Sequence, residues 1–416
     1  MRIATSQIYS SNVATMDSQQ SQLLQIQQQI STGVSISNPA DNPLGAAQAV
    51  TLSATSATLT QYSANQNTAL AALQLEDTTL TSVTSTMQSI HSLIIEAQNG
   101  SLTDTARQGI AKQMQGYRDQ LLTLANTTDG AGNYIFSGFQ STSQVFSNKS
   151  GGGVTYNGDA GQRVMQVAGS RTIAVGDTGA AVFQSVQAVG SDIVASGSSN
   201  PANQGTGVIS GVTVTDPTQP TNNDNYSITF GTDPVTGALT YSVTDKSVTP
   251  VTPSPPATFT SGSAISLGSG MNVTITGTPA TTDTFSVTPA TASQNTDVFT
   301  SIDSIISALN TPVSGSTAAV ANLSNALNTG LTQIGNSLSN VITVQASVGG
   351  REQEVKALQT VTSSNSLQVT SNLSDLTSTD MTAAISQYEQ LSNALTASQK
   401  SFAATQNLSL FQYINP

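Results

Sequence analysis

The fold of this chain is decided by a stretch near its C-terminus, residues 377–411, which reads TSTDMTAAISQYEQLSNALTASQKSFAATQNLSLF. Apolar residues recur here at every seventh position and predict a helix with one narrow apolar stripe, as wide as a coiled-coil seam. Thr377 and Asp380, three residues apart, predict a capping box just before the stripe. The stripe consists of Met381, Tyr388, Leu395 and Phe402, flanked by Ala384, Ile385 and Leu391.

A second stripe of the same period lies at the opposite end of the chain. It predicts a helix over residues 5–31, which Gly33 would end in a left-handed conformation. Because two seams of equal period and similar length occupy opposite termini, we expect the two helices to pair, with everything between them as an insertion. The stripe consists of Tyr9, Met16, Leu23 and Ile30, with Val13 and Ile26 beside it.

Composition narrows the classes of function. Only 8% of the 416 residues are charged, the net charge is −12, and the eleven Lys and Arg form no basic run. This pattern argues against nucleic acid or an anionic membrane surface as a partner. Cysteine is absent, and no apolar run has the length of a membrane span. Residues 1–11 contain no apolar core of a signal peptide, so we expect neither a cleaved leader nor membrane insertion.

Two long helices are predicted after a double-proline corner at residues 38–43, where Asn42 would be the N-cap and Pro43 the first helical residue. The break at 99–101 makes the second helix the antiparallel neighbour of the first. The first helix has two rows at seven-residue spacing, which are Leu59, Gln66, Leu73, Leu80, Met87 and Ile94, and Tyr62, Ala69, Glu76, Val83, Ile90 and Ala97. Helical periodicity returns at 299–309 and, less regularly towards its end, at 327–369. The helix directly after the break at 99–101 has an apolar stripe that consists of Arg107, Ile110, Met114, Tyr117, Leu121 and Leu124.

Between these helices the apolar period changes to two, which predicts antiparallel strands. Alternation is clear at 226–230, 239–243, 273–275 and 285–287, and shorter strands are predicted at 164–167 and 172–175. The proline-rich segment 249–256 is predicted to be an exposed loop. A second loop predicted at 195–206 leaves open whether this region has one lobe or two.

The sequence therefore predicts an α+β fold in which helical segments from both ends are nested around a β region. The terminal coiled-coil pair would comprise residues 1–40 and 375–416. A helical bundle would comprise residues 41–137 and 297–374, and the antiparallel β domain residues 138–296.

Side chains that could carry chemistry are few. His91, the only histidine, is predicted to lie on a helix flank, and the lack of cysteine argues against a transition-metal site. Glu76 lies in a seam row, where a solvated edge or a register-setting role is favoured over a functional one. Asp41 fits a turn better than a cation site. The loop residues Asp216, Asp224, Asp233 and Asp245 lack the spacing of a calcium loop. We therefore predict no enzyme activity, no cofactor and no metal.

The terminal stripes remain as the candidate functional feature. Two helices that meet along one thin seam are marginally stable alone, and they are better explained if further copies pack around them. Asp17 is the only charge on the first helix, and glutamines are common there. The predicted assembly seam consists of Tyr9, Met16, Leu23, Ile30, Met381, Tyr388, Leu391, Leu395, Phe402, Leu408, Leu410 and Phe411.

Several separated motifs occur in an order that resembles the bacterial flagellin family, and within it the group that forms the junction between flagellar hook and filament. The motif STG at 31–33 resembles the flagellin family as a whole. The finer resemblance rests on MRIAT (1–5), PADNP (39–43), GNYIFSGFQ (132–140), VGGR (348–351) and LSLF (408–411). It covers roughly residues 1–140 and 297–416. Val34 and Ser35 depart from it, because the family usually has basic residues after the glycine.

The resemblance implies a structural role outside the cell. Copies of the chain would form a ring between the preceding junction protein on the hook side and flagellin on the filament side. Export would proceed unfolded through the flagellar type III apparatus, with a chaperone on the C-terminal helix.

Two other readings stay open at this point. A flagellin-type filament subunit is disfavoured by the PADNP corner and the LSLF ending. A secreted Ser/Thr-rich adhesin or glycan-binding protein is disfavoured because only 5% of residues are aromatic and most of these fall at inward strand positions.

Overall fold

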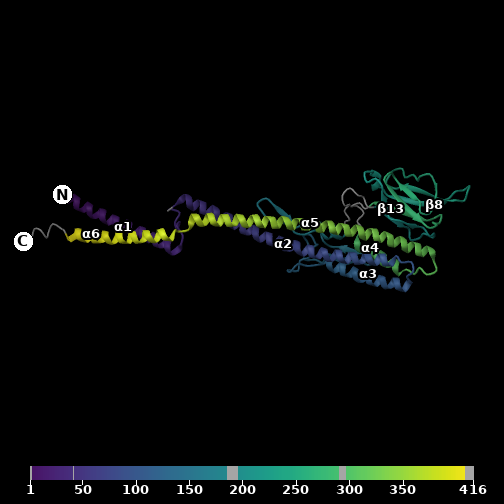
Figure 1. Cartoon of the computed structure of the whole chain (residues 1–416), viewed down its shortest axis with the longest axis horizontal. Coiled ribbons are helices and arrows are strands. Elements are labelled where there is room, and N and C mark those ends of the chain that lie inside the picture. The colour runs from purple at the N-terminus through teal and green to yellow at the C-terminus, as the bar shows by residue number, and fades with distance from the viewer. Residues whose placement is uncertain (1, 41, 185–194, 290–296, 408–416) are drawn as a thin grey trace, which may run out of the picture. The chain divides into compact units, whose positions relative to one another are not determined.

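The computed structural model describes residues 2–40, 42–184, 195–289 and 297–407, and the chain divides into two compact units (Figure 1). The terminal unit combines residues 1–64 with residues 357–416, and the central unit consists of residues 65–356. Two helices, α2 (Pro43–Ala97) and α5 (Thr317–Thr377), contribute to both. Long helices occur together with antiparallel sheets, so the predicted α+β class is confirmed. The three-domain division stays a prediction.

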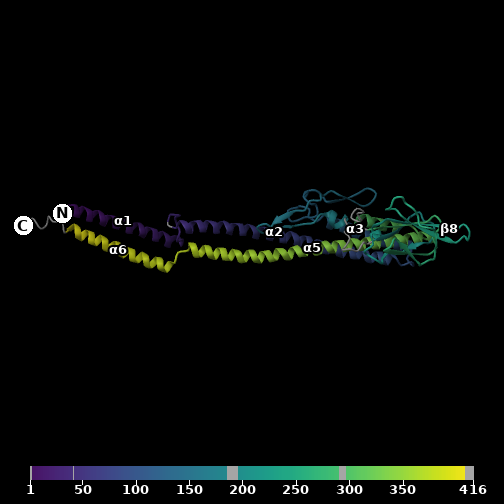
Figure 2. The same cartoon turned by 90° about the horizontal axis from the view of Figure 1, so that it is seen from above.

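In the terminal unit, α1 (Arg2–Thr32) and α6 (Met381–Asn407) lie side by side, as both views show (Figures 1 and 2). They run antiparallel, because the ring of Tyr9 near the start of α1 lies 5.2 Å from that of Phe402 near the end of α6. α1 ends at Gly33, whose φ of 71° is the left-handed conformation that glycine adopts at little cost. The predicted pairing of the two termini is confirmed.

The predicted capping box at Thr377 is wrong. α5 continues through Thr377, whose hydroxyl donates to the carbonyl of Leu373 one turn earlier. Asp380 caps α6 instead, since its Oδ1 accepts from the backbone N–H groups of Thr382 and Ala383 at 3.0 and 3.1 Å. A long helix that reaches Thr377 leaves only three residues before α6, so the cap must come from within them.

The central unit contains a helical bundle built from α2, α3 (Asp104–Ala125), α4 (Val298–Asn310) and α5. Thr103 and Asp297 cap α3 and α4 through their side-chain oxygens. Both predicted rows of α2 are buried in this unit, so the seven-residue spacing correctly predicted the buried face of this helix. The buried residues of these rows are Gln66, Ala69, Leu73, Glu76, Leu80, Val83, Met87, Ile90, Ile94 and Ala97.

Two short hairpins follow α3 and pack on the bundle. They are β1 (Phe146–Asn148) with β2 (Val154–Tyr156) and β3 (Val164–Gln166) with β4 (Thr172–Ala174). Aromatic rings connect the first hairpin to the helices, with centroid separations of 5.5 to 6.0 Å. This aromatic cluster consists of Phe136, Phe146, Phe183 and Phe299.

Two larger antiparallel sheets share one apolar core and form a β-sandwich over residues 195–289. Their strand orders are β10-β9-β8-β13-β5 and β11-β12-β6, with β7 also paired to β12. The strands are β5 (Ala195–Ser199), β6 (Val208–Ile209), β7 (Thr213–Val214), β8 (Tyr226–Thr232), β9 (Leu239–Asp245), β10 (Ala257–Thr258), β11 (Ala264–Leu267), β12 (Met271–Thr276) and β13 (Thr284–Pro289).

The predicted loop at 195–206 is wrong in its first half. The sequence ASGSS at 195–199 has no apolar alternation, yet it forms the edge strand β5 by pairing with β13. The partner strand supplies the ladder hydrogen bonds that local propensity does not favour. The predicted strands at 226–230, 239–243, 273–275 and 285–287 are confirmed, and the segment 249–256 is exposed as predicted.

Candidate assembly surface

The α1–α6 pair buries little of its seam. Among the described apolar residues of the two helices, only Ile26 and Ala384 are buried. The side chains of Tyr9, Met381 and Ile385 are 53%, 43% and 46% exposed. Half-buried positions are Met16, Leu23, Ile30, Tyr388, Leu391, Leu395 and Phe402. Leu408, Leu410 and Phe411 lie outside the described residues.

This exposure follows from the geometry of a two-helix pair. Each helix covers only the strip that faces its partner, and a seam residue needs neighbours on both sides to lose its water. Leu24 on α1 adds a further exposed apolar side chain. From Gln7 to the end of α1, Asp17 is the single charged residue, and α6 carries Glu389 and Lys400. A surface of this kind, with apolar residues set among amides and hydroxyls, can pack against other helices without burying many charges.

Backbone hydrogen bonds connect the N-terminal and C-terminal segments where α1 ends and α6 begins. The N–H of Thr379 donates to the carbonyl of Gly33 at 3.0 Å, and the N–H of Ser35 donates to Thr377 at 2.7 Å. Val34 and Ser378 form an antiparallel bridge. These contacts fix the register of the helix pair at its closed end. Val34 and Ser35, the positions that depart from the family pattern, thus contribute backbone groups to this joint.

Among the other side chains considered from the sequence, Asp224 and Asp245 lie next to each other, and burial, followed by the charge of Asp245, raises the pKa of Asp224. His91 lies half-buried on α2, and Asp41 lies outside the described residues. The described residues contain no group of three or more His, Cys, Asp or Glu that could hold a metal ion. In the same ranges, no helix has an apolar stretch long enough to cross a membrane. Asp216 and Asp233 accept hydrogen bonds within their own turns.

Glu76 is not at a solvated edge, contrary to that reading of the sequence. Its side chain is 2% exposed, and Oε1 accepts from the backbone N–H of Asp177 at 2.9 Å. Burial, followed by the nearby negative charge of Asp177, raises the pKa of Glu76 to about 7. Arg351, in the VGGR motif of α5, pairs with the carboxylate of Asp177. Glu76 lies midway along a buried row of α2, where neighbouring helices and the segment after β4 cover it. This position explains why the expected solvated edge is wrong.

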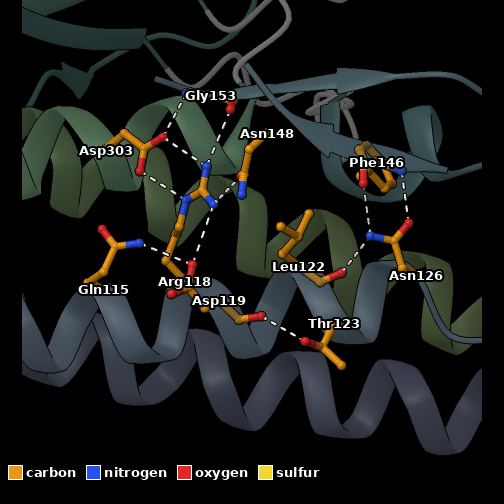
Figure 3. Close-up of polar contacts among 10 residues, drawn as sticks. All are labelled: Gln115, Arg118, Asp119, Leu122, Thr123, Asn126, Phe146, Asn148, Gly153 and Asp303. Atoms are coloured by element: carbon orange, nitrogen blue, oxygen red, sulfur yellow. Dashed lines mark hydrogen bonds and ion pairs between the residues drawn. The ribbon is translucent and has the colours of Figure 1, made fainter. Parts of the chain in front are cut away.

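Sequence reasoning missed a buried arginine that ties the first hairpin to the bundle (Figure 3). Arg118 of α3 forms a two-point ion pair with Asp303 of α4, and its guanidinium also donates to Asn148 and to the carbonyl of Gly153. Its charge lies 5.7 Å from the ring centroid of Phe299. Arg118 lies four residues after Met114 and three before Leu121, on the buried face of α3, whereas the predicted stripe took the half-buried Tyr117 at this turn.

Asparagines anchor further backbone segments. Asn126, at the end of α3, accepts from the N–H of Phe146 at 2.9 Å and donates to the carbonyl of the same residue at 3.0 Å, so it acts as a strand edge for β1 (Figure 3). Asn325 of α5 does the same for β6, contacting the N–H of Ile209 and the carbonyl of Gly207. The spacing of Asn322, Asn325 and Asn328 along one helix was the available signal, because asparagine has low helix propensity.

Comparison with known proteins adds the family context. A family model described as the bacterial flagellin N-terminal helical region matches residues 3–141. The chain is 31% identical to flagellar hook-associated protein 3 of Escherichia coli (strain K12) over 412 residues, covering 99% of each chain. It is also similar to the crystal structure of flagellar hook-associated protein-3 from Legionella pneumophila, with a TM-score of 0.69 and 28% identity over 78% of this chain and 98% of that one. The crystal structure of Xanthomonas campestris FlgL is similar with a TM-score of 0.67 and 27% identity, covering 77% and 98%.

Proposed function

Because the chain belongs to the family of flagellar hook-associated protein 3, we propose that it is a structural subunit of the bacterial flagellum that joins the hook to the filament. The half-exposed seam of the α1–α6 pair is the observation that carries the mechanism. A helix pair that leaves Tyr9, Met381 and Ile385 about half exposed is complete only when other helices cover these side chains. Copies of the chain in a ring would supply them.

The chemistry of the seam fits repeated packing of like subunits. Apolar side chains would lose their remaining exposed area, and each square ångström of apolar surface removed from water contributes roughly 25 cal/mol. The amides of α1 could pair with those of neighbouring copies, whereas buried charges would be costly. The predicted assembly seam, which includes Leu408, Leu410 and Phe411, therefore stands as the subunit contact in this proposal.

The proposed partners follow from a position between two different lattices. They are further copies of the chain, the preceding junction protein on the hook side, flagellin on the filament side and an export chaperone on the C-terminal helix. Export through the flagellar type III apparatus, without a cleaved signal peptide, would deliver the chain to the extracellular flagellum. The role is structural rather than enzymatic. Neither a filament-subunit nor an adhesin function is favoured by a specific observation in the described residues.

The test compares the exposed apolar side chains at the start of α6 with an exposed apolar side chain elsewhere in the chain. Met381→Asp combined with Ile385→Asp places two charges on the exposed side of α6, where folding of the central unit does not depend on them. Val235→Asp, at a side chain 91% exposed in the turn between β8 and β9, is the matched control. Cells that carry the double variant should build hooks without filaments and release flagellin into the medium, whereas control cells should swim. Normal swimming by the double variant would contradict the proposal.

A further inference from the structure

Glu76 is a carboxyl group buried where an ionised side chain is unfavourable. It is in the middle of the buried row of α2, and its Oε1 accepts from the N–H of Asp177, which follows β4. The other oxygen, Oε2, has no hydrogen-bond partner among the described residues. An ionised carboxylate buried in this way loses its hydration and gains one backbone hydrogen bond in return.

The cation that attracts the Glu76 carboxylate, Arg351, is paired with another carboxylate. Arg351 of α5 pairs with the carboxylate of Asp177 and donates to the carbonyl of Ala174 at 3.2 Å. Two carboxylates therefore share one guanidinium, and the attraction of Arg351 for Glu76 is smaller than the combined effect of burial and of Asp177. The remaining charged groups on the packed elements have partners of their own or lie at the border of the adjoining cavity. They include Asp77, Asp129, Arg163, the pair Arg171–Glu354 and the pair Lys356–Glu352.

The segment that Glu76 holds is attached by buried apolar side chains, Val167 and Ile173, and by polar contacts. The carbonyl of Val167 accepts from the side-chain amide of Gln66 at 2.7 Å, and Arg171 at the hairpin turn pairs with Glu354 of α5. A cavity of about 470 Å³ borders the same segment, with Glu76 and Val164 among its lining residues. Water therefore has a short route to the carboxyl if the segment lifts.

From this arrangement we propose that Glu76 is a proton-sensitive latch, which holds the segment from β3 to Asp177 against α2 and α5 when protonated and loosens it when ionised. The sign follows from linkage. The pKa of Glu76 in the folded chain is raised from the ordinary value of 4.5 to about 7. The latch is therefore strongest below about pH 4.5, weakens as the pH rises towards 7, and changes little above that.

Amide hydrogen exchange across pH 5 to 8 tests this latch. The opening constants of the β3–β4 amides, corrected for the intrinsic pH dependence of exchange, should rise at least about tenfold over this range in the wild-type chain. In Glu76→Gln they should change less than about twofold. Glu354→Gln, which removes an exposed carboxylate from the same region, should keep the wild-type pH dependence. Amides of α3 serve as the reference for opening of the whole unit.

Three results would overturn the latch. The first is an unchanged pH dependence in Glu76→Gln, and the second is opening of the α3 amides in parallel with those of the hairpin. The third needs no variant: a carboxyl carbon resonance of Glu76 that titrates near its ordinary pKa of 4.5 in the wild-type chain. This last measurement decides the matter if Glu76→Gln does not fold.

Discussion

Arg118 of α3 and Asp303 of α4 are 185 positions apart in the sequence, and they form an ion pair with two contacts of 3.0 and 3.1 Å. The N–H of Gly153 donates to the same carboxylate at 2.6 Å, so the pair also fixes the turn between β1 and β2 (Figure 3). The side chain of Arg118 is 5% exposed. A buried charge with this many partners is satisfied only as a set, and removal of one member leaves the others without compensation.

We therefore expect Arg118→Met to lower the free energy of unfolding of the central unit by about 3–5 kcal/mol, the usual cost of breaking a buried ion pair. Arg171→Met is the matched control, since Arg171 also pairs with a carboxylate but its side chain is 57% exposed. It should cause no measurable change. Urea unfolding followed by circular dichroism gives both values. Equal effects of the two substitutions would mean that burial of Arg118 does not matter.

A second pair of substitutions compares the bundle core with the assembly seam in their effects on stability and assembly. Leu121→Ala removes a fully buried side chain from α3 and should destabilise the chain by roughly 2–5 kcal/mol. Leu395→Ala removes a half-buried side chain of α6 and should leave the melting temperature almost unchanged while impairing assembly in cells. Calorimetry of the purified variants and electron microscopy of flagella measure the two effects. A large melting shift for Leu395→Ala would show that the seam already contributes fully to the isolated chain.

The helix pair should also be the part of the isolated chain most open to proteases. It buries few apolar side chains, and long helices without tertiary support are marginal in water. Limited proteolysis should remove roughly the first 35 and last 40 residues well before it cuts the bundle. Mass spectrometry of the fragments locates the cuts. Equal resistance of the helix pair and the bundle would contradict this expectation.

Sequence periodicity predicted the parts of the fold whose cause is local and repeated. Rows such as Leu73 and Leu80 on α2 were found because each position repeats the same burial seven residues later. Arg118 and Asn325 were missed, since the groups that satisfy their side chains lie far away in the chain. Edge strand β5 was missed for the same reason. The pairing of α1 with α6 was predicted, but its use in assembly depends on other molecules.

Burial of Glu76 predicts a pH-dependent stability, whether or not the hairpin opens alone. Because its pKa in the folded chain lies above its ordinary value, Glu76 contributes stability in its protonated form, and this is lost as the pH rises from about 4.5 to about 7. Glu76→Gln should match the wild type at pH 5 and exceed it by roughly 1–3 kcal/mol at pH 8. Urea midpoints at both pH values measure the difference. An equal pH dependence of the two proteins would assign the effect to other groups.

The last prediction asks which part of the chain flagellar assembly can do without. Ala195 and Pro289 are register partners at the ends of β5 and β13, so the sandwich begins and ends at adjacent positions. Residues 195–289 can therefore be replaced by a short Gly/Ser linker at little cost in loop entropy, which grows only as the logarithm of length.

Cells that carry this deletion should still build filaments and swim, because α1 and α6 are intact. Deletion of residues 391–416 instead removes most of α6 and with it the partner of Tyr9. Those cells should make hooks without filaments and lose flagellin to the medium. Swimming speed and secreted flagellin are measured in both strains. If the tail deletion swam normally and the sandwich deletion did not, the sandwich would be the functional part and the proposed role of the seam would be wrong.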